Sequence, residues 1–209
     1  MGSNESSIEQ LQDSCLRELT NIGLGHATMA LASLTGQNFN MDVPSMSVTA
    51  APDLTCVFTN PEELTVAVSM PFTGDVQGQT AFFFPWASAQ RLSRLLTGLA
   101  PADLDSIDEL FGSTILEVGN ILCSSFLNAI SDMTGLRMEA TPPAVSIDGA
   151  QSIVSTLIVE ACFQDTQILT LETRIFEESS ETLDGRFLCM PASGGLQTVF
   201  ERLGVAEAA

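Results

Sequence analysis

The sequence predicts a mixed α/β (α+β) protein built from two copies of one unit that are related by a pseudo-two-fold axis. A pattern Ser-x-x-x-Glu-x-x-Asn, followed 23 residues later by Pro, occurs twice at an offset of 99 residues. The two copies are Ser14, Glu18, Asn21 and Pro44, and Ser113, Glu117, Asn120 and Pro143. At the same offset, 12 of the 42 residues from 7 to 48 are identical, which indicates an internal duplication. Both halves also show the same order of helix, strands and helix.

The first half, about residues 7–98, begins with a long helix that ends near Gly36. Ser7-x-x-Gln10 has the form of a capping box for its start, and the glycine is typical of a C-terminal cap. Strands are expected at Val43–Ala50, Thr55–Thr59, Leu64–Met70 and Gly78–Phe84, where Val, Thr and Phe alternate with turns. A second helix follows Pro85 and ends at Gly98.

The second half, about residues 106–204, repeats this order after a linker at 99–105. Ser106-x-x-Glu109 is the matching capping box, and Gly135 is the matching C-terminal cap of a helix at about 106–134. Strands are expected near 143–150, 152–163, 166–177 and 185–190, and a last helix from Pro191 to Gly204. We therefore expect a single domain over residues 1–209, with one mainly antiparallel sheet packed with helices.

Each motif is expected on one face of its helix. Positions i, i+4 and i+7 share a face, so Ser14, Glu18 and Asn21 project together, as do their counterparts in the second half. The apolar residues at helical spacing flank that face. These are Ile8, Leu11, Cys15, Leu19 and Ile22 in the first helix, and Ile107, Leu110, Leu116, Ile121 and Leu122 in the second.

Composition excludes several classes of function. The chain has 7 Lys and Arg against 26 Asp and Glu, a net charge of −19, which argues against nucleic acid and anionic membranes as partners. The five cysteines, Cys15, Cys56, Cys123, Cys162 and Cys189, have no metal-binding or redox spacing. They are typical of reduced thiols in a cytoplasmic protein. We expect no signal peptide and no membrane span.

The duplicated residues contain no nucleophile–base pair. His26 is the one histidine, and its counterpart is Ser125, so a Ser–His–Asp triad is unsupported. No metal-ligand cluster or phosphate-binding glycine loop is present in the sequence, so we expect no cofactor of its own. A carboxamide can orient a water molecule for in-line attack on a phosphoryl group, and a carboxylate can pair with a basic residue of a partner.

The doubled pattern resembles the CheC/CheX/FliY family of bacterial and archaeal chemotaxis phosphatases, in its two-site CheC form. Glu18-Leu19-Thr20-Asn21-Ile22 and Glu117-Val118-Gly119-Asn120-Ile121 are both similar to the E-x-x-N-I core of that family. The resemblance covers about residues 7–204.

The resemblance implies an enzyme that removes the phosphoryl group from the phospho-aspartate of a CheY-type response regulator, which carries its own Mg²⁺. By position, Asn21 and Asn120 would orient the hydrolytic water, and Glu18 and Glu117 would pair with a basic residue of the regulator. The Ser and Pro positions, Ser14, Ser113, Pro44 and Pro143, would support the motif. CheD is a further partner of CheC proteins in some organisms.

Three other interpretations remain open at this stage. The chain could be a binding module that sequesters the phosphorylated regulator or CheD without turnover. It could be a flagellar-switch component of the FliY type. The Glu and Asn could also be purely structural, bridging the two helices of the repeat. The unchanged spacing in both halves favours catalysis, and the stiffer sequence after Asn120 than after Asn21 favours the second site as the more active one.

Overall fold

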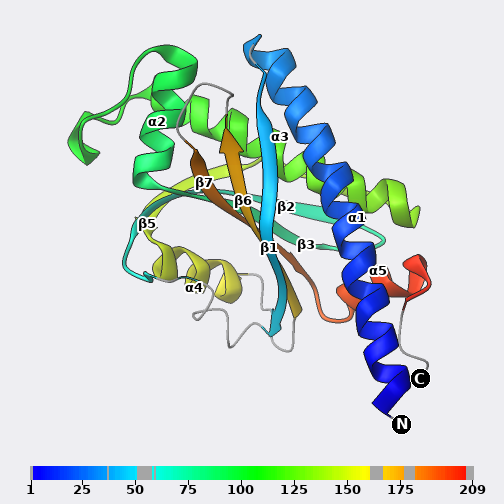
Figure 1. Cartoon of the computed structure of the whole chain (residues 1–209). Helices are drawn as coiled ribbons and strands as arrows, with labels where there is room; N and C mark the ends of the chain where they lie inside the picture. Colours follow the sequence, from blue (N-terminus) through cyan, green and yellow to red (C-terminus); the bar gives the residue numbers. More distant parts are fainter. Residues whose placement is uncertain are drawn as a thin grey trace.

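In the part of the chain that a computed structural model describes, seven strands form one antiparallel sheet with helices on both faces (Figure 1). The structure describes residues 2–36, 38–50, 58, 60–160, 167–176 and 182–205. The elements of the first half are α1 (Gly2–Thr35), β1 (Asn40–Ala50), β2 (Leu64–Gly74), β3 (Gly78–Pro85) and α2 (Trp86–Thr97). After a short 3₁₀ helix (Leu104–Ser106) come α3 (Glu109–Thr134), β4 (Met138–Ala140), β5 (Ala144–Gly149), α4 (Ala150–Glu160), β6 (Gln167–Phe176), β7 (Leu183–Pro191) and α5 (Gly195–Leu203).

The strand order confirms the predicted pseudo-two-fold arrangement. The sheet runs β1-β6-β7-β3-β2-β4, and β5 also pairs with β2. By sequence position β1 corresponds to β4 and β5 together, β2 to β6, and β3 to β7. Exchanging each strand for its counterpart and reading the order backwards gives the same order again. The pseudo-dyad therefore passes through the central β3–β7 pair, where Ala81 lies opposite Leu188.

Alternating strand residues build a core on each face of the sheet. On one face Val68, Phe82 and Phe187 pack with α1, α2, α3 and α5 in the larger core. On the other face Ala67, Phe83 and neighbouring strand residues pack against α4 (Figure 1). Because successive strand side chains point to opposite faces, one set of strands serves both cores.

The strand expected near 152–163 is wrong, because residues 150–160 form helix α4. Ile153, Val154 and Leu157 are buried at helical spacing, and they cover the face of the sheet that the other helices leave open. A short apolar run rich in β-branched residues fits a strand and a buried helix equally well from sequence. The expected strand at Thr55–Thr59 falls, apart from Phe58, outside the described residues, and Phe58 itself is in no strand.

Both expected capping boxes are wrong, whereas both C-terminal caps are confirmed. Helix α1 begins at Gly2, so Ser7 lies within it. The Asp108 carboxylate accepts from the backbone N–H of Phe111 at 2.8 Å and caps α3, while Ser106 pairs with Asp103 in the preceding 3₁₀ helix. Gly36 and Gly135 adopt φ of 72° and 67°, the left-handed conformation that ends a helix.

Helix α3 is the one described helix that is long and apolar enough to cross a membrane by length and composition. Its apolar residues Ile115, Leu122 and Phe126 are buried in the larger core. The helix is therefore accounted for as the central core helix of this fold.

Candidate functional site

The first motif lies on the outer face of α1. Ser14, Glu18 and Asn21 are all exposed, and Leu19 and Thr20 between them are buried. The Ser14 hydroxyl donates to the backbone carbonyl of Gln10 at 2.9 Å. The glutamate and the asparagine therefore present their polar ends to solvent from one helical face, as predicted.

The second motif has the same form on α3, with one difference. Ser113 and Glu117 are exposed, but Asn120 is half-buried. The Ser113 hydroxyl donates to the carbonyl of Leu110 at 3.1 Å, so both motif serines bond to their own helix. The Ser124 hydroxyl donates to Oδ1 of Asn120 at 3.4 Å, a long hydrogen bond that restrains the amide together with its partial burial. Sequence reasoning missed Ser124, although its i+4 spacing from Asn120 was a usable signal.

Pro44 and Pro143 stand at matching breaks in edge strands. The register of β1 against β6 shifts between Asp42 and Ser45, so Pro44 sits in the irregularity. In the second half the corresponding break separates β4 from β5, and Pro143 is the last residue of that break, directly before β5. Proline has no N–H to donate to a strand ladder, so each one suits such a break.

The first motif borders a hollow of about 500 Å³ between α1 and β1. Asn21 and Pro44 both line it, so the structure brings these two predicted residues together. The other lining residues are Arg17, Thr20, Leu24, Met41, Asp42, Val43, Ser45 and Met46. Arg17 places a positive charge beside the first motif, whereas its counterpart beside the second motif is Leu116.

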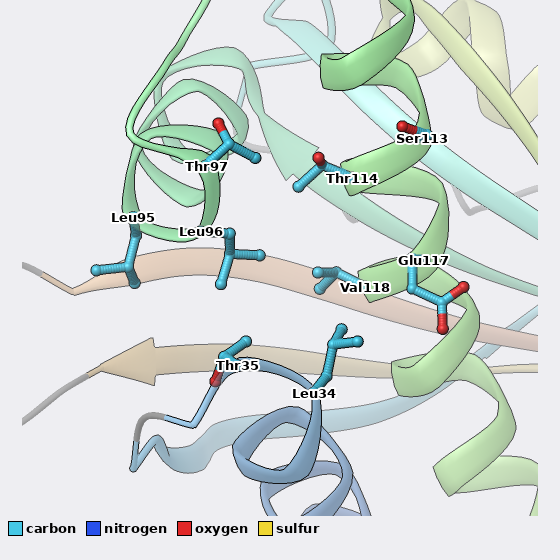
Figure 2. Close-up of a pocket in the computed structure, with 9 residues that line it drawn as sticks. All are labelled: Leu34, Thr35, Leu95, Leu96, Thr97, Ser113, Thr114, Glu117 and Val118. Carbon is cyan, nitrogen blue, oxygen red and sulfur yellow. The ribbon is translucent and has the colours of Figure 1, made fainter.

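The second motif borders a different hollow, of about 360 Å³, at its Ser–Glu end (Figure 2). The walls come from the ends of α1 and α2 and from α3, through Leu34, Thr35, Leu95, Leu96, Thr97, Ser113, Thr114, Glu117 and Val118. Figure 2 shows the Glu117 carboxylate directed away from Leu95 and Leu96. The aliphatic side chains thus form the inner wall, and the carboxylate lies at the rim.

Two of the described cysteines, Cys123 and Cys189, lie in the core. Burial raises the pKa of the Cys123 thiol to about 12, an effect that a hydrogen bond from Thr80 partly offsets. Burial also raises the pKa of Cys189 to about 12, and the nearby Cys123 adds to this. Within the described part of the chain, no three His, Cys, Asp or Glu side chains are grouped so that they could hold a metal ion.

Comparison with known proteins is consistent with this duplicated arrangement. The model of the CheC-like family matches residues 11–48 and 112–147. Each matched segment contains one complete Ser–Glu–Asn–Pro motif. The chain is thus similar to the CheC-like family in both of its motif segments. The resemblance inferred from the motif spacing is thereby confirmed.

Relatives of this CheC-like chain include two proteins of Bacillus subtilis (strain 168). The CheY-P phosphatase CheC is 28% identical over 204 residues, which cover 96% of this chain and 98% of the relative. The flagellar motor switch phosphatase FliY is 22% identical over 141 residues, covering 67% of this chain but 36% of that protein.

Two solved structures show the same fold. FliY of Thermotoga maritima has a TM-score of 0.72 at 17% identity, with 91% of this chain and 94% of that chain covered. A chain of the CheX–CheY–BeF₃–Mg²⁺ complex of Borrelia burgdorferi has a TM-score of 0.54 at 17% identity, with 83% and 97% covered. The mixed helical and antiparallel architecture is therefore shared across these proteins.

Proposed function

We propose that this CheC-like protein is a phosphatase that hydrolyses the phospho-aspartate of a CheY-type response regulator. The observation that carries the proposal is the Glu–Asn pair on one face of a core-anchored helix, present twice in one chain, with both glutamates exposed. The extent of the similarity supports it, because the CheY-P phosphatase CheC aligns over nearly all of both chains. A chain in a CheX–CheY complex shares the fold, which supports a CheY-type partner.

The proposed mechanism needs only positioning and electrostatics from this chain. The amide of Asn21 or Asn120 holds a water molecule in line with the phosphorus–oxygen bond of the phospho-aspartate. Glu18 or Glu117 pairs with a basic residue beside the phosphorylated aspartate and sets the depth at which the amide enters. The regulator contributes the phosphoryl group, the Mg²⁺ and that basic residue.

The residues around each motif support a role in positioning the regulator. Ser14 and Ser113 satisfy their hydroxyls on their own helices, so they keep the motif face free of competing side-chain bonds. The net charge of −19 favours approach of a basic surface. Pro44 and Pro143 maintain the strand breaks beside the motif helices.

The experiment is the decay of a CheY-type regulator loaded with acetyl phosphate, followed with and without this protein. The wild type is expected to accelerate decay, and the Asn21→Ala/Asn120→Ala double variant is expected to lose about 100-fold or more of that acceleration. Asn128→Ala is the matched control, because Asn128 is an exposed asparagine on α3 outside the motif.

Each other outcome has a definite meaning. Acceleration that survives in the double variant overturns the role of the asparagines. Binding of the phosphorylated regulator without acceleration identifies a sequestering module. Neither binding nor acceleration overturns the proposal and directs the search to CheD and to a FliY-like role in the flagellar switch.

A further inference from the structure

Two leucines are exposed at equivalent positions of the two repeats. Leu11 is 51% exposed and Leu110 is 45% exposed, and they are related by the 99-residue offset of the motif. Helical periodicity favours both as residues of the buried face, yet the fold leaves both outside. A single exposed leucine needs no explanation, but here the same exposure is found at the equivalent position of both repeats.

This duplication is particular to these two residues. The other large hydrophobic residues that are exposed in the described part of the chain are Met29, Leu34, Val48, Leu99, Leu104 and Val159. None of them has an exposed apolar counterpart at the 99-residue offset: Met29 corresponds to Asn128, for example, and Leu34 to the half-buried Met133. Leu11 and Leu110 are thus the one exposed apolar pair that obeys the symmetry of the motif among the described residues.

Both leucines lie on the motif face of their helices. Seven residues separate Leu11 from Glu18 and Leu110 from Glu117, so each leucine lies within about 20° of its glutamate around the helix axis. Ten residues separate each leucine from its asparagine, about 15 Å along the axis. Leucine, serine, glutamate and asparagine therefore form one continuous stripe in each repeat, Leu11–Asn21 on α1 and Leu110–Asn120 on α3.

Within each stripe, the groups left to meet a partner are apolar at one end and polar at the other. The serine hydroxyl is already bonded to a carbonyl of its own helix, at 2.9 Å in the first stripe and 3.1 Å in the second. The leucine offers only apolar area, and the glutamate offers a negative charge about 10 Å further along the helix. A complementary surface needs a basic residue with an apolar patch beside it.

We propose that Leu11 and Leu110 are docking anchors that contact an apolar patch of the phosphorylated regulator next to its basic residue. The inference rests on the proposed function, because it takes the CheY-type regulator as the occupant of the stripe. Each leucine is a positioning residue, since it contacts the body of the regulator about 15 Å from the asparagine that acts on the phosphoryl group. It should therefore govern affinity and leave the chemical step unchanged.

The two repeats supply matched controls for one another. In an Asn21→Ala background only the second site can turn over, so Leu110→Ala should raise KM for the phosphorylated regulator about tenfold and leave kcat unchanged. Leu11→Ala in that background should change neither constant. In an Asn120→Ala background, Leu11→Ala should raise KM and Leu110→Ala should change neither constant.

Conservative variants separate apolar contact from folding. Leu11→Met and Leu110→Met keep the apolar area and should keep the wild-type KM, whereas the alanine variants should keep the fold because alanine is the best helix former. Leu104→Ala is a further control, since Leu104 is as exposed as Leu11, at 51%, and lies in the connecting 3₁₀ helix.

Binding to a beryllofluoride-loaded regulator with Mg²⁺ distinguishes failure of this inference from failure of the proposed function. Weaker binding by the Leu11→Ala/Leu110→Ala variant supports the docking role even if the wild type shows no phosphatase activity. Unchanged binding and KM in that variant, with wild-type activity intact, overturns the docking role and leaves the phosphatase in place. No binding of the wild type overturns both.

Discussion

The two motif sites share the same Ser, Glu, Asn and Pro but differ in the side chains around their asparagines. Asn21 is exposed beside a polar hollow that contains Arg17, and Gly23 and Gly25 follow it in the helix. Asn120 is half-buried and restrained by Ser124. The duplication has thus kept the groups proposed to act on the regulator, while the neighbours that orient them have diverged.

The largest expected difference between the sites concerns their cysteines. Cys15 lies next to Ser14 and is half-buried, whereas Cys123 follows Asn120 by three residues, is buried and has its pKa raised to about 12 by that burial. In a Cys56→Ser/Cys162→Ser variant, a thiol reagent at neutral pH should modify Cys15 and leave Cys123 and Cys189 at least about 100-fold slower. Mass spectrometry of the native protein checks this.

The same burial predicts a direction for stability with pH. The pKa of each buried thiol is about 12 in the folded protein, whereas the ordinary pKa of a cysteine thiol is 9.0. Above pH 9 the unfolded chain therefore loses thiol protons that the folded protein keeps. The free energy of unfolding should therefore fall as pH rises from about 9 towards 12. Urea titrations across this pH range measure the change, and a constant free energy of unfolding would contradict the buried environment of Cys123 and Cys189.

The next largest effect concerns the two asparagines singly. We expect the restrained Asn120 to carry most of the activity, so Asn120→Ala should lower kcat/KM about tenfold, which corresponds to about 1.4 kcal/mol. Asn21→Ala should lower it less than about twofold. Steady-state kinetics on the loaded regulator measure both, with Asn128→Ala as the control. Loss of most activity in Asn21→Ala alone would reverse the ranking of the sites.

The glycines after Asn21 provide a test of its looser support. A Cβ at Gly25 would meet no atom within 4 Å, so Gly25→Ala should raise the free energy of unfolding by about 1 kcal/mol. A Cβ at Gly23 would lie 2.6 Å from Cδ1 of Phe126, so Gly23→Ala should lower it by about 1–3 kcal/mol. Urea titrations measure both changes.

The Gly25→Ala variant also has a kinetic readout. In an Asn120→Ala background it should increase turnover at the first site if helix flexibility limits that site. Increased stability with unchanged turnover would show that flexibility is not the limiting factor.

The smallest expected effect comes from Arg17. A basic residue of the regulator that pairs with Glu18 would also meet the positive charge of Arg17, so Arg17→Leu, which copies Leu116, should raise kcat/KM about twofold at low salt. The measurement is made in an Asn120→Ala background, and the gain should fade as salt increases. Arg174→Leu gives the same charge change on β6. An equal gain in that control would assign the effect to net charge alone.

Much of the fold was predictable because its signals are local or repeated. The glycine caps at Gly36 and Gly135 follow from the left-handed conformation that glycine tolerates, and both are present. The motif face followed from helical spacing alone. The two capping-box predictions were wrong for different reasons. Helix α1 begins at Gly2, before Ser7, and Asp108 rather than Ser106 caps α3. The spacing of Ser and Glu alone cannot distinguish between neighbouring candidate caps.

Residues 150–160 show why other features were out of reach. This segment forms a helix because Ile153, Val154 and Leu157 then bury their side chains against the face of the sheet opposite the main core. That apolar face exists only once the sheet has formed. The restraint on Asn120 and the two unlike hollows likewise depend on residues far apart in the chain.

The sequence by itself determined the duplication, the two Glu–Asn pairs and the helices that display them, because periodicity and spacing are properties of the chain. Only the tertiary structure decided which apolar residues are buried. Leu19 and Leu11 obey the same helical period, yet Leu19 is 1% exposed and Leu11 is 51% exposed. Burial depends on what packs against a helix face, and that is settled when α1 and α3 meet the sheet.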